Sequence, residues 1–292
     1  MCSEEVLLVS MEKLNELPPL SNAARKILEI IYNPDVDISV FVEIVEQEPV
    51  LLAKLIGLAN SAYFGHRSIS NVQRAIIDVL GLRTAKNIAL GVVLSGIFDT
   101  RNCQNFNVSD YWLNSLFCAS LARNIARKVP ELESDEAYLC GMLHEIGQMA
   151  LAFLYPQVMN TILESEPDDR LSTEIEKFDR NHYQISAQLM ANWHLPDIVI
   201  KEQLSAGLNN TAVLSPMGQL IHYCQILAMQ LFYPSDAPQV QSETESANEQ
   251  YSIVSQYPVP ECLQAYTAQV EEVYNDSASR VDDFKEMAKL LS

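Results

Sequence analysis

Apolar side chains recur every three to four residues along most of this chain, whereas the period of two that marks half-buried strands is almost absent. In the first hundred residues this spacing predicts short helices, which proline, glycine and asparagine turn signals separate. These helices are expected near residues 23–31, 40–45, 49–59, 72–80 and 84–98. The pattern therefore predicts an all-α protein.

A polar, asparagine-rich stretch at residues 99–110 precedes a second helical series. Its helices are expected near residues 112–126, around the apolar run 139–147, and from a capping box at Thr173–Glu176 through His182 to Trp193–Pro196. Two uncharged runs, 146–163 and 217–233, contain interrupting Gln, Asn, His or Pro residues. They are typical of buried core helices and not of membrane spans.

The last part of the chain differs in composition, since residues 236–292 hold 11 acidic and 3 basic side chains. We expect a lead-in at residues 1–12 and a helical domain at 13–235, with subdomains at about 13–99 and 110–235. An acidic connector and a helical C-terminal tail should follow at 236–292. The polar stretch 239–250 should be more mobile than the core, because it offers few apolar groups to offset its ordering entropy.

Charge and cysteine usage limit the function classes. The 292 residues include 38 acidic and 19 basic side chains, a net charge of −19, which opposes general binding to nucleic-acid backbones or anionic membranes. The acidic start of the chain shows no secretory signal, so we expect a cytoplasmic protein without membrane association. The six cysteines are scattered and are typical of buried thiols.

The pair His144-Glu145 lies inside an otherwise apolar helical run, Leu139–Gly147, and is the strongest chemical signal in the chain. Adjacent side chains on a helix diverge by roughly 100°, so the pair can hold a metal only if other elements supply further ligands. The pair alone is a weak signal.

Short motifs elsewhere follow a recognisable order. They are Leu17-Pro18-Pro19-Leu20, Glu48-Pro49-Val50-Leu51, Leu58–Phe64, Ile69-Ser70, Ala75-Ile76, Leu80-Gly81, Trp112–Ser115, Gly141–Gly147, His182 and Trp193–Pro196. In this order they resemble the HDOD domain, a branch of the HD superfamily of metal-dependent phosphohydrolases found in bacterial signalling proteins. The resemblance covers about residues 13–230 and implies an HD-like, multi-helix fold.

The resemblance also indicates where metal ligands would lie in an active HD enzyme. An early His is replaced by Asn114, the His-Asp pair by His144 and Glu145, and a distant Asp by Gln225. Residues 200–206 contain none of the histidines that many relatives have there. His182 is expected near the same hollow as a packing and hydrogen-bonding residue. We therefore expect a degenerate site with no metal and no cofactor.

A different motif spans residues 75–88 and has the form of a helix-turn-helix, with Arg83 and Lys86 early in its second helix. Arg67 and Arg74 lie nearby in the sequence, so these four basic residues are a candidate surface for a ligand or partner. Helix pairs joined by Leu-Gly are common packing units, and the acidic chain lacks a broad basic face. Nucleic-acid binding is therefore the weaker interpretation.

The leading hypothesis is a non-enzymatic regulatory module in bacterial signal transduction that binds a signalling protein or a small ligand. One alternative is a degenerate HD phosphohydrolase that acts on a nucleotide or phosphate ester through a metal at His144 and Glu145. The other is a helix-turn-helix nucleic-acid binder. The sequence identifies neither the signal nor the partner.

Overall fold

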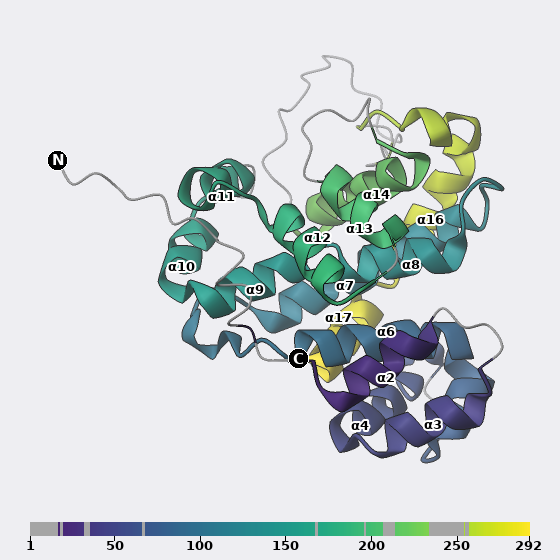
Figure 1. The fold of residues 1–292 in the computed structure, drawn as a ribbon. Helices are drawn as coiled ribbons and strands as arrows, with labels where there is room; N and C mark the ends of the chain where they lie inside the picture. The colour runs from purple at the N-terminus through teal and green to yellow at the C-terminus, as the bar shows by residue number, and fades with distance from the viewer. Residues whose placement is uncertain are drawn as a thin grey trace.

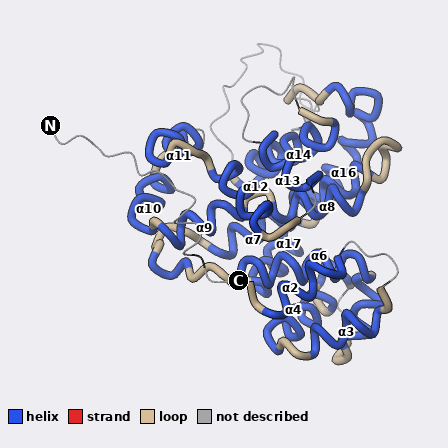
Figure 2. Tube along the Cα trace, in the orientation of Figure 1, coloured by secondary structure: helices blue, strands red, loops and turns tan. Residues whose placement is uncertain are grey.

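The structure is a computed structural model that describes residues 17, 20–31, 36–65, 68–166, 169–195, 197–206, 214–233, 254 and 257–292. All regular structure in these ranges is helical, as the blue segments of Figure 2 show, which confirms the all-α prediction. The predicted mobile stretch 239–250 lies outside the described residues.

The first helices form a compact group, drawn in purple and blue in Figure 1. It contains α2 (Asn22–Ile31), α3 (Ile38–Glu46), α4 (Pro49–Ala59), the short helices η1 (Ala62–Phe64), α5 (Val72–Ala75) and η2 (Ile76–Leu80), and α6 (Leu82–Ser95). Local chemistry fixes their starts: Asp37 caps α3 by accepting from the Ser39 amide, and Pro49 is the first residue of α4. Gly81 makes the turn before α6 with a φ of 75°.

The second group is built on the long helix α7 (Val108–Ala126), which follows the short turn η3 (Thr100–Asn102). The remaining members are α8 (Ser134–Leu143), α9 (Ile146–Leu154), α10 (Pro156–Glu164), α11 (Arg170–Phe178), α12 (His182–Asn192), α13 (Asp197–Ala206) and α14 (Pro216–Phe232). Helix α7 packs against α8, α14 and two C-terminal helices, α16 (Thr267–Ser279) and α17 (Val281–Leu291). It is therefore the central element of this group.

Two predicted helices are each divided in the structure. The run 146–163 breaks at Tyr155, where Pro156 starts α10, and the segment expected to run from Thr173 through His182 breaks at Asp179, whose φ is 58°. Helix α12 instead starts at His182, and its capping box is formed by Asn181 and Gln184. Apolar periodicity continues across both breaks and therefore did not show them.

The C-terminal helices are η6 (Glu261–Tyr266), α16 (Thr267–Ser279) and α17 (Val281–Leu291). Helix α17, yellow in Figure 1, lies between the two groups and packs against α7, α4 and η1. The Phe284 ring of α17 packs at a tilt against Tyr63 of η1 and edge-to-face against Phe117 of α7, with ring centroids 5.0 and 5.3 Å apart. The end of the chain thus ties the two helical groups together.

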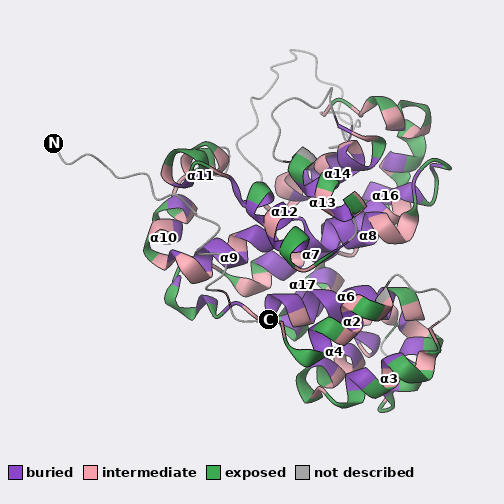
Figure 3. Cartoon of the chain, viewed as in Figure 1, coloured by how far each residue is buried: buried purple, intermediate pink, exposed green. Residues whose placement is uncertain are grey.

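One stretch, Ser134–Leu154, is long and apolar enough by length and composition to cross a membrane, but 83% of its most apolar window is buried inside the protein. It comprises α8 and α9, which are largely purple in Figure 3, with a turn between them at His144 and Glu145. The described cysteines are free thiols, and all of them except the half-buried Cys262 are buried.

Helices α7 and α8 approach each other closely at Gly141. A Cβ placed there would lie 2.7 Å from the Ala119 Cα, whereas a Cβ at Gly57 in α4 would meet only the Leu290 side chain at 3.6 Å. We expect Gly141→Ala to lower the free energy of unfolding by about 1–3 kcal/mol, because backbone atoms must move apart.

Gly57→Ala is the matched control and should leave stability unchanged or raise it, by at most about 1 kcal/mol, because alanine favours a helix. Urea unfolding followed by circular dichroism measures both variants. Equal stability of the two would contradict the close contact between α7 and α8.

Candidate functional site

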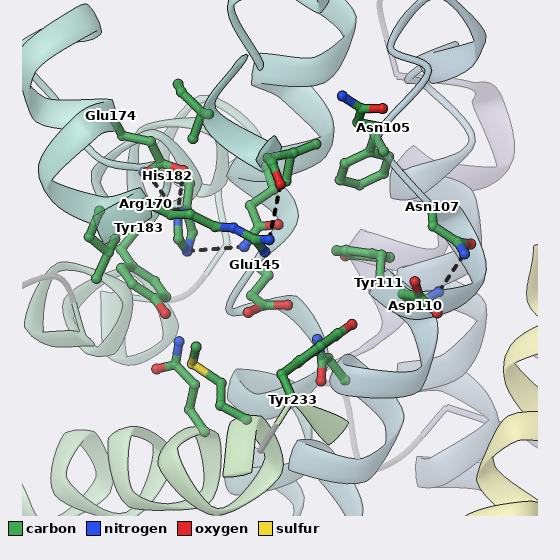
Figure 4. Close-up of a pocket in the computed structure, with 18 residues that line it drawn as sticks. Asn105, Asn107, Asp110, Tyr111, Glu145, Arg170, Glu174, His182, Tyr183 and Tyr233 are labelled. Atoms are coloured by element: carbon green, nitrogen blue, oxygen red, sulfur yellow. Dashed lines mark hydrogen bonds and ion pairs between the residues drawn. The ribbon is translucent and has the colours of Figure 1, made fainter. Parts of the chain in front are cut away.

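A cavity of about 210 Å³ lies in the second helical group, between α7, α9, α10, α11, α12 and α14. We call it the central hollow. Of the five predicted degenerate-site positions, four line it: Asn114, Glu145, His182 and Gln225. His144 lies behind this lining and is only 1% exposed. Sequence positions more than a hundred residues apart therefore meet at one hollow, as Figure 4 shows.

The turn between α8 and α9 places His144 and Glu145. Helix α8 ends at Leu143 and α9 starts at Ile146, so the pair lies at a bend and not within one continuous helix. Gly147 lets α9 meet α12 backbone to backbone, since a Cβ there would lie 2.0 Å from the His182 carbonyl oxygen. The Gly147 amide donates to the Ser186 hydroxyl at 2.8 Å. Gly147, the last residue of the Gly141–Gly147 motif, is therefore required for α9 to pack closely against α12.

His144 is held in a single orientation. Its Nδ1 lies 2.7 Å from the Gly141 carbonyl oxygen, which can only accept, so Nδ1 carries a proton and donates. Burial lowers the pKa of His144 in spite of the neighbouring Glu145, so the ring is neutral at pH 7. The unprotonated Nε2 faces the Glu145 Oε1 at 3.7 Å. This distance is too long for a hydrogen bond between them.

His182 is paired with Glu174, a residue that the sequence analysis did not identify as functional. The His182 Nδ1 lies 2.8 Å from the Glu174 Oε2, and the His182 amide donates to the same oxygen at 2.8 Å. Burial alone would lower the pKa of His182, but the charge of Glu174 and its hydrogen bond outweigh this and raise the pKa above 6.5. The partners lie on either side of the break at Asp179, so helical periodicity could not pair them.

The rest of the lining contains polar and aromatic side chains that sequence reasoning missed. Arg170 donates to the backbone carbonyls of Leu163 and Ser165, at 3.0 and 3.3 Å, and so fastens α11 to the end of α10. Tyrosine side chains from α7, α12 and the end of α14 complete the walls, together with Asp110. These tyrosines are Tyr111, Tyr183 and Tyr233. No apolar pattern distinguished them from core residues.

The donor set does not fit the divalent metal that an HD enzyme requires. His144 and Glu145 offer one nitrogen and one carboxylate, while Asn114 and Gln225 offer only neutral amides. Within the described ranges, no group of three or more His, Cys, Asp or Glu side chains is placed to hold a metal ion. Catalytic metals in proteins are held by about three charged or imidazole ligands.

The predicted basic surface does not form as one patch. Arg67 lies outside the described residues, Arg74 is exposed and pairs with Asp78 at 3.3 Å, and Arg83 pairs with Asp135 at 2.6 Å. Lys86 contradicts the prediction, because it is 3% exposed and donates to the Ile30 carbonyl at 3.0 Å.

The structure also corrects the helix-turn-helix interpretation. The helix pair exists, but its second helix, α6, is a core helix in which every residue from Thr84 to Val92 is buried. A recognition helix must present its side chains to a DNA groove. Helix α6 instead uses them to pack against the rest of the protein.

The pKa values of the two buried histidines should be shifted from 6.5 in opposite directions. His182 should show a pKa above 6.5 that falls in Glu174→Gln, whereas His144 should stay neutral until the pH is below 6.5. Proton binding to His182 favours the folded state, so its contribution to stability is full below pH 6.5 and is lost as the pH rises through its raised folded-state pKa.

Nuclear magnetic resonance of the imidazole nitrogens measures both values, and His144 serves as the internal control for changes in the fold. A His182 pKa that does not change in Glu174→Gln would show that the buried pair does not set it.

The chain resembles known proteins in sequence and in fold. Residues 17–205 match the HDOD domain. A protein of Treponema pallidum without an assigned function is 28% identical over 197 residues, which are 65% of this chain and 37% of that protein.

Among solved structures, a candidate signal transduction protein from Marinobacter aquaeolei is 25% identical with a TM-score of 0.72, over 99% of this chain and 63% of that one. A candidate phosphohydrolase from Shewanella amazonensis and an HDOD domain protein of unknown function from Geobacter sulfurreducens share the fold. Each has a TM-score of 0.68, with identities of 21% and 20% and coverage of 97% and 96% of both chains. The HDOD match covers more than half of the sequence and includes the central hollow's α7, α9 and α12. This chain belongs to the HDOD domain family.

Proposed function

We propose that this protein is a non-enzymatic regulatory module of signal transduction that binds a partner protein or a small ligand. Membership of the HDOD family and the likeness to a candidate signal transduction protein fit a regulatory role. The chain spans only 63% of that protein's length. The observation that carries the proposal is the donor set of the central hollow.

The described residues of the central hollow do not bring together the set of donors that a metal needs. Removing water from a divalent cation is offset only by several close anionic or imidazole donors. Here Asn114 and Gln225 supply amide dipoles, and the His182 Nε2 lies 3.4 Å from the Gln148 Nε2. These side chains suit hydrogen bonding to a bound molecule better than activation of a water nucleophile.

The walls of the hollow favour a polar ligand of modest size. A cavity of about 210 Å³ with amides, carboxylates and tyrosine rings offers both hydrogen-bond partners and flat surfaces. Burial raises the pKa of Tyr111 and of Tyr183, so both hydroxyls remain protonated donors at neutral pH. A molecule bound here would contact α7, α11 and α12 together and could report its presence through them.

A metal-dependent phosphohydrolase is the second candidate, because one feature of an active site is retained. The His144 ring donates from Nδ1 to a backbone carbonyl, which leaves Nε2 free beside the Glu145 carboxylate. Metal-bound histidines in proteins are oriented in the same way. Two ligands are too few for a firm catalytic metal, and this deficit ranks the enzyme second.

Elemental analysis and phosphodiester assays distinguish the two candidates. We expect protein purified without chelator to hold no stoichiometric manganese or iron, and to hydrolyse neither generic phosphodiesters nor cyclic dinucleotides when either metal is added. His144→Ala should leave metal content unchanged and lower the melting temperature, because it removes a buried hydrogen bond and leaves a gap in the core. Stoichiometric metal with turnover that His144→Ala abolishes would establish the phosphohydrolase.

Restoring the missing ligands tests the assignment of positions. The triple variant Asn114→His, Glu145→Asp, Gln225→Asp should bind manganese on the order of tenfold or more tightly than the wild type, because it adds one imidazole and one carboxylate. The variant Asn114→Gln, Glu145→Asp, Gln225→Asn is the control with unchanged charge. If the folded triple variant gains no affinity over this control, the three side chains do not converge as described.

A further inference from the structure

A second cavity, of about 250 Å³, lies where the two helical groups meet. We call it the junction cavity. Its lining comes from α4, η1, η2 and α6 of the first group, from α7 and α8 of the second, and from α17. It shares no lining residue with the central hollow, and the proposed function above assigns it no role. Any molecule inside it would contact both helical groups and the C-terminal helix at once.

One face of α7 forms a gradient along this cavity. Leu116, Ser120, Arg123 with Asn124, and Arg127 follow each other at intervals of three to four residues, so they lie on one side of the helix. Leu116 is 3% and Ser120 7% exposed, Arg123 and Asn124 are half-buried, and Arg127 is exposed. The face therefore changes from apolar and buried to cationic and open.

The buried end of the junction cavity is apolar and aromatic. Phe284 and Met287 of α17 line it together with aliphatic side chains from α4, η2 and α6. The Tyr63 hydroxyl and the Ser120 hydroxyl satisfy each other at 2.9 Å, so they place no unpaired polar group there. An apolar body entering from the open end would lose water-exposed surface, which is the main favourable term for such binding.

The open end of the junction cavity is basic, although the protein as a whole is acidic. No Asp or Glu is among the described residues that line the cavity, although the chain carries a net charge of −19. Arg123 is engaged by Thr84 at 2.6 Å and Asp135 at 3.2 Å, and so serves the fold. The Arg127 guanidinium has one long hydrogen bond, 3.5 Å to the Asn124 Oδ1, and no ion pair with any described residue. Its guanidinium is available to an anion.

We propose that the junction cavity binds a small amphiphilic organic anion, with its apolar body towards Leu116 and Phe284 and its carboxylate or phosphate at Arg127 and Asn124. The order of side chains along α7 sets this orientation. A guanidinium and an amide at the mouth provide planar donors that match such a head group. The volume suits a ligand smaller than most drug-sized molecules, which occupy pockets of about 300–1,000 Å³.

Binding in the junction cavity would stabilise the contact between the two helical groups. The ligand would fill space between α7 and α17, and a filled apolar cavity gains contacts that an empty one lacks. A ligand in the junction cavity would therefore favour the form of the protein in which α17 packs against α7. The size of this effect equals the difference in the ligand's binding free energy between this form and one in which α17 is detached. This gives the protein an input that is independent of the central hollow.

Calorimetric titration with octanoate tests the proposal on the full chain. Octanoate has the stated chemistry; acetate lacks the apolar body, and octyltrimethylammonium carries the opposite charge. We expect octanoate alone to bind with a one-to-one stoichiometry and to slow hydrogen exchange in Val281–Leu291. Arg127→Gln should weaken octanoate binding by about tenfold or more, because it removes a charge-assisted hydrogen bond.

Lys128→Gln is the matched control, since Lys128 is exposed, adjacent in sequence and absent from the lining. It should bind octanoate as the wild type does. Asn124→Trp, at a half-buried position of the mouth, should block binding while the melting temperature shows that the fold persists. If Arg127→Gln and Lys128→Gln lower the affinity for octanoate equally, the effect comes from the overall charge and not from Arg127. That result would overturn the proposal.

Two other outcomes would also overturn it. If Arg127→Gln lowers the melting temperature but leaves octanoate affinity unchanged, Arg127 serves only the end of α7, where cations are favoured by the helix dipole. Stronger binding to phosphatidylglycerol vesicles than to free octanoate would identify a membrane surface as the source of the anion. We expect no such binding, because the net charge of −19 repels an anionic bilayer.

Discussion

The structure depends on the close packing of α7 against α8. Gly141 and Ala119 bring the two backbones within a distance that leaves no room for a side chain at position 141. This contact sets the end of α8, and therefore the bend at which His144 and Glu145 lie, relative to Asn114 on α7. A second glycine, Gly147, fixes the other side of the bend against α12 by the same means. The geometry of the central hollow thus follows from two positions where only glycine fits.

This arrangement holds both buried histidines in place through hydrogen bonds of the protein itself. The histidine of the pair is held by the Gly141 carbonyl, and His182 is held by Glu174, so neither orientation needs a metal. A buried histidine without such partners would cost free energy, since buried polar groups must be hydrogen-bonded. Both residues therefore have structural reasons to persist, and their presence alone is no evidence for catalysis.

The sequence predicted much of this structure because helices, turns and motifs are local signals. The all-α class is confirmed in the described residues, where Asn114, Glu145, His182 and Gln225 line one hollow. The convergence came from the order of family motifs and could not have come from periodicity, which contains no information on distances between helices.

Failures of prediction have equally specific causes. The Glu174–His182 pair joins residues across a left-handed turn at Asp179, so neither helical spacing nor composition reveals it. Lys86 was assigned to a candidate surface because it lies early in the second helix of the helix-turn-helix motif, but its ammonium donates to the Ile30 carbonyl and the residue is buried. For a single charged residue on a core helix, the sequence does not distinguish a side chain exposed to solvent from one that is buried and hydrogen-bonded.

The few basic residues have a shared role that also bears on partners. Several donate to backbone carbonyls of a different element and so act as ties between helices; these are Lys54 to Leu291, Lys86 to Ile30, Arg170 to Leu163 and Ser165, and Arg280 to Tyr63. Arg83 and Arg123 share Asp135 and connect α6 and α7 to α8.

Positive charge used inside the fold cannot also form the extended basic face that non-specific DNA binding requires. Because only 19 basic residues are present against 38 acidic ones, these internal ties leave a surface dominated by carboxylates. Such a surface repels the phosphate backbone of a nucleic acid. Arg127, beside the apolar junction cavity, can still attract a small anion at short range, where salt screens the interaction least. The charge distribution therefore fits the proposed binding of a small anion in the junction cavity.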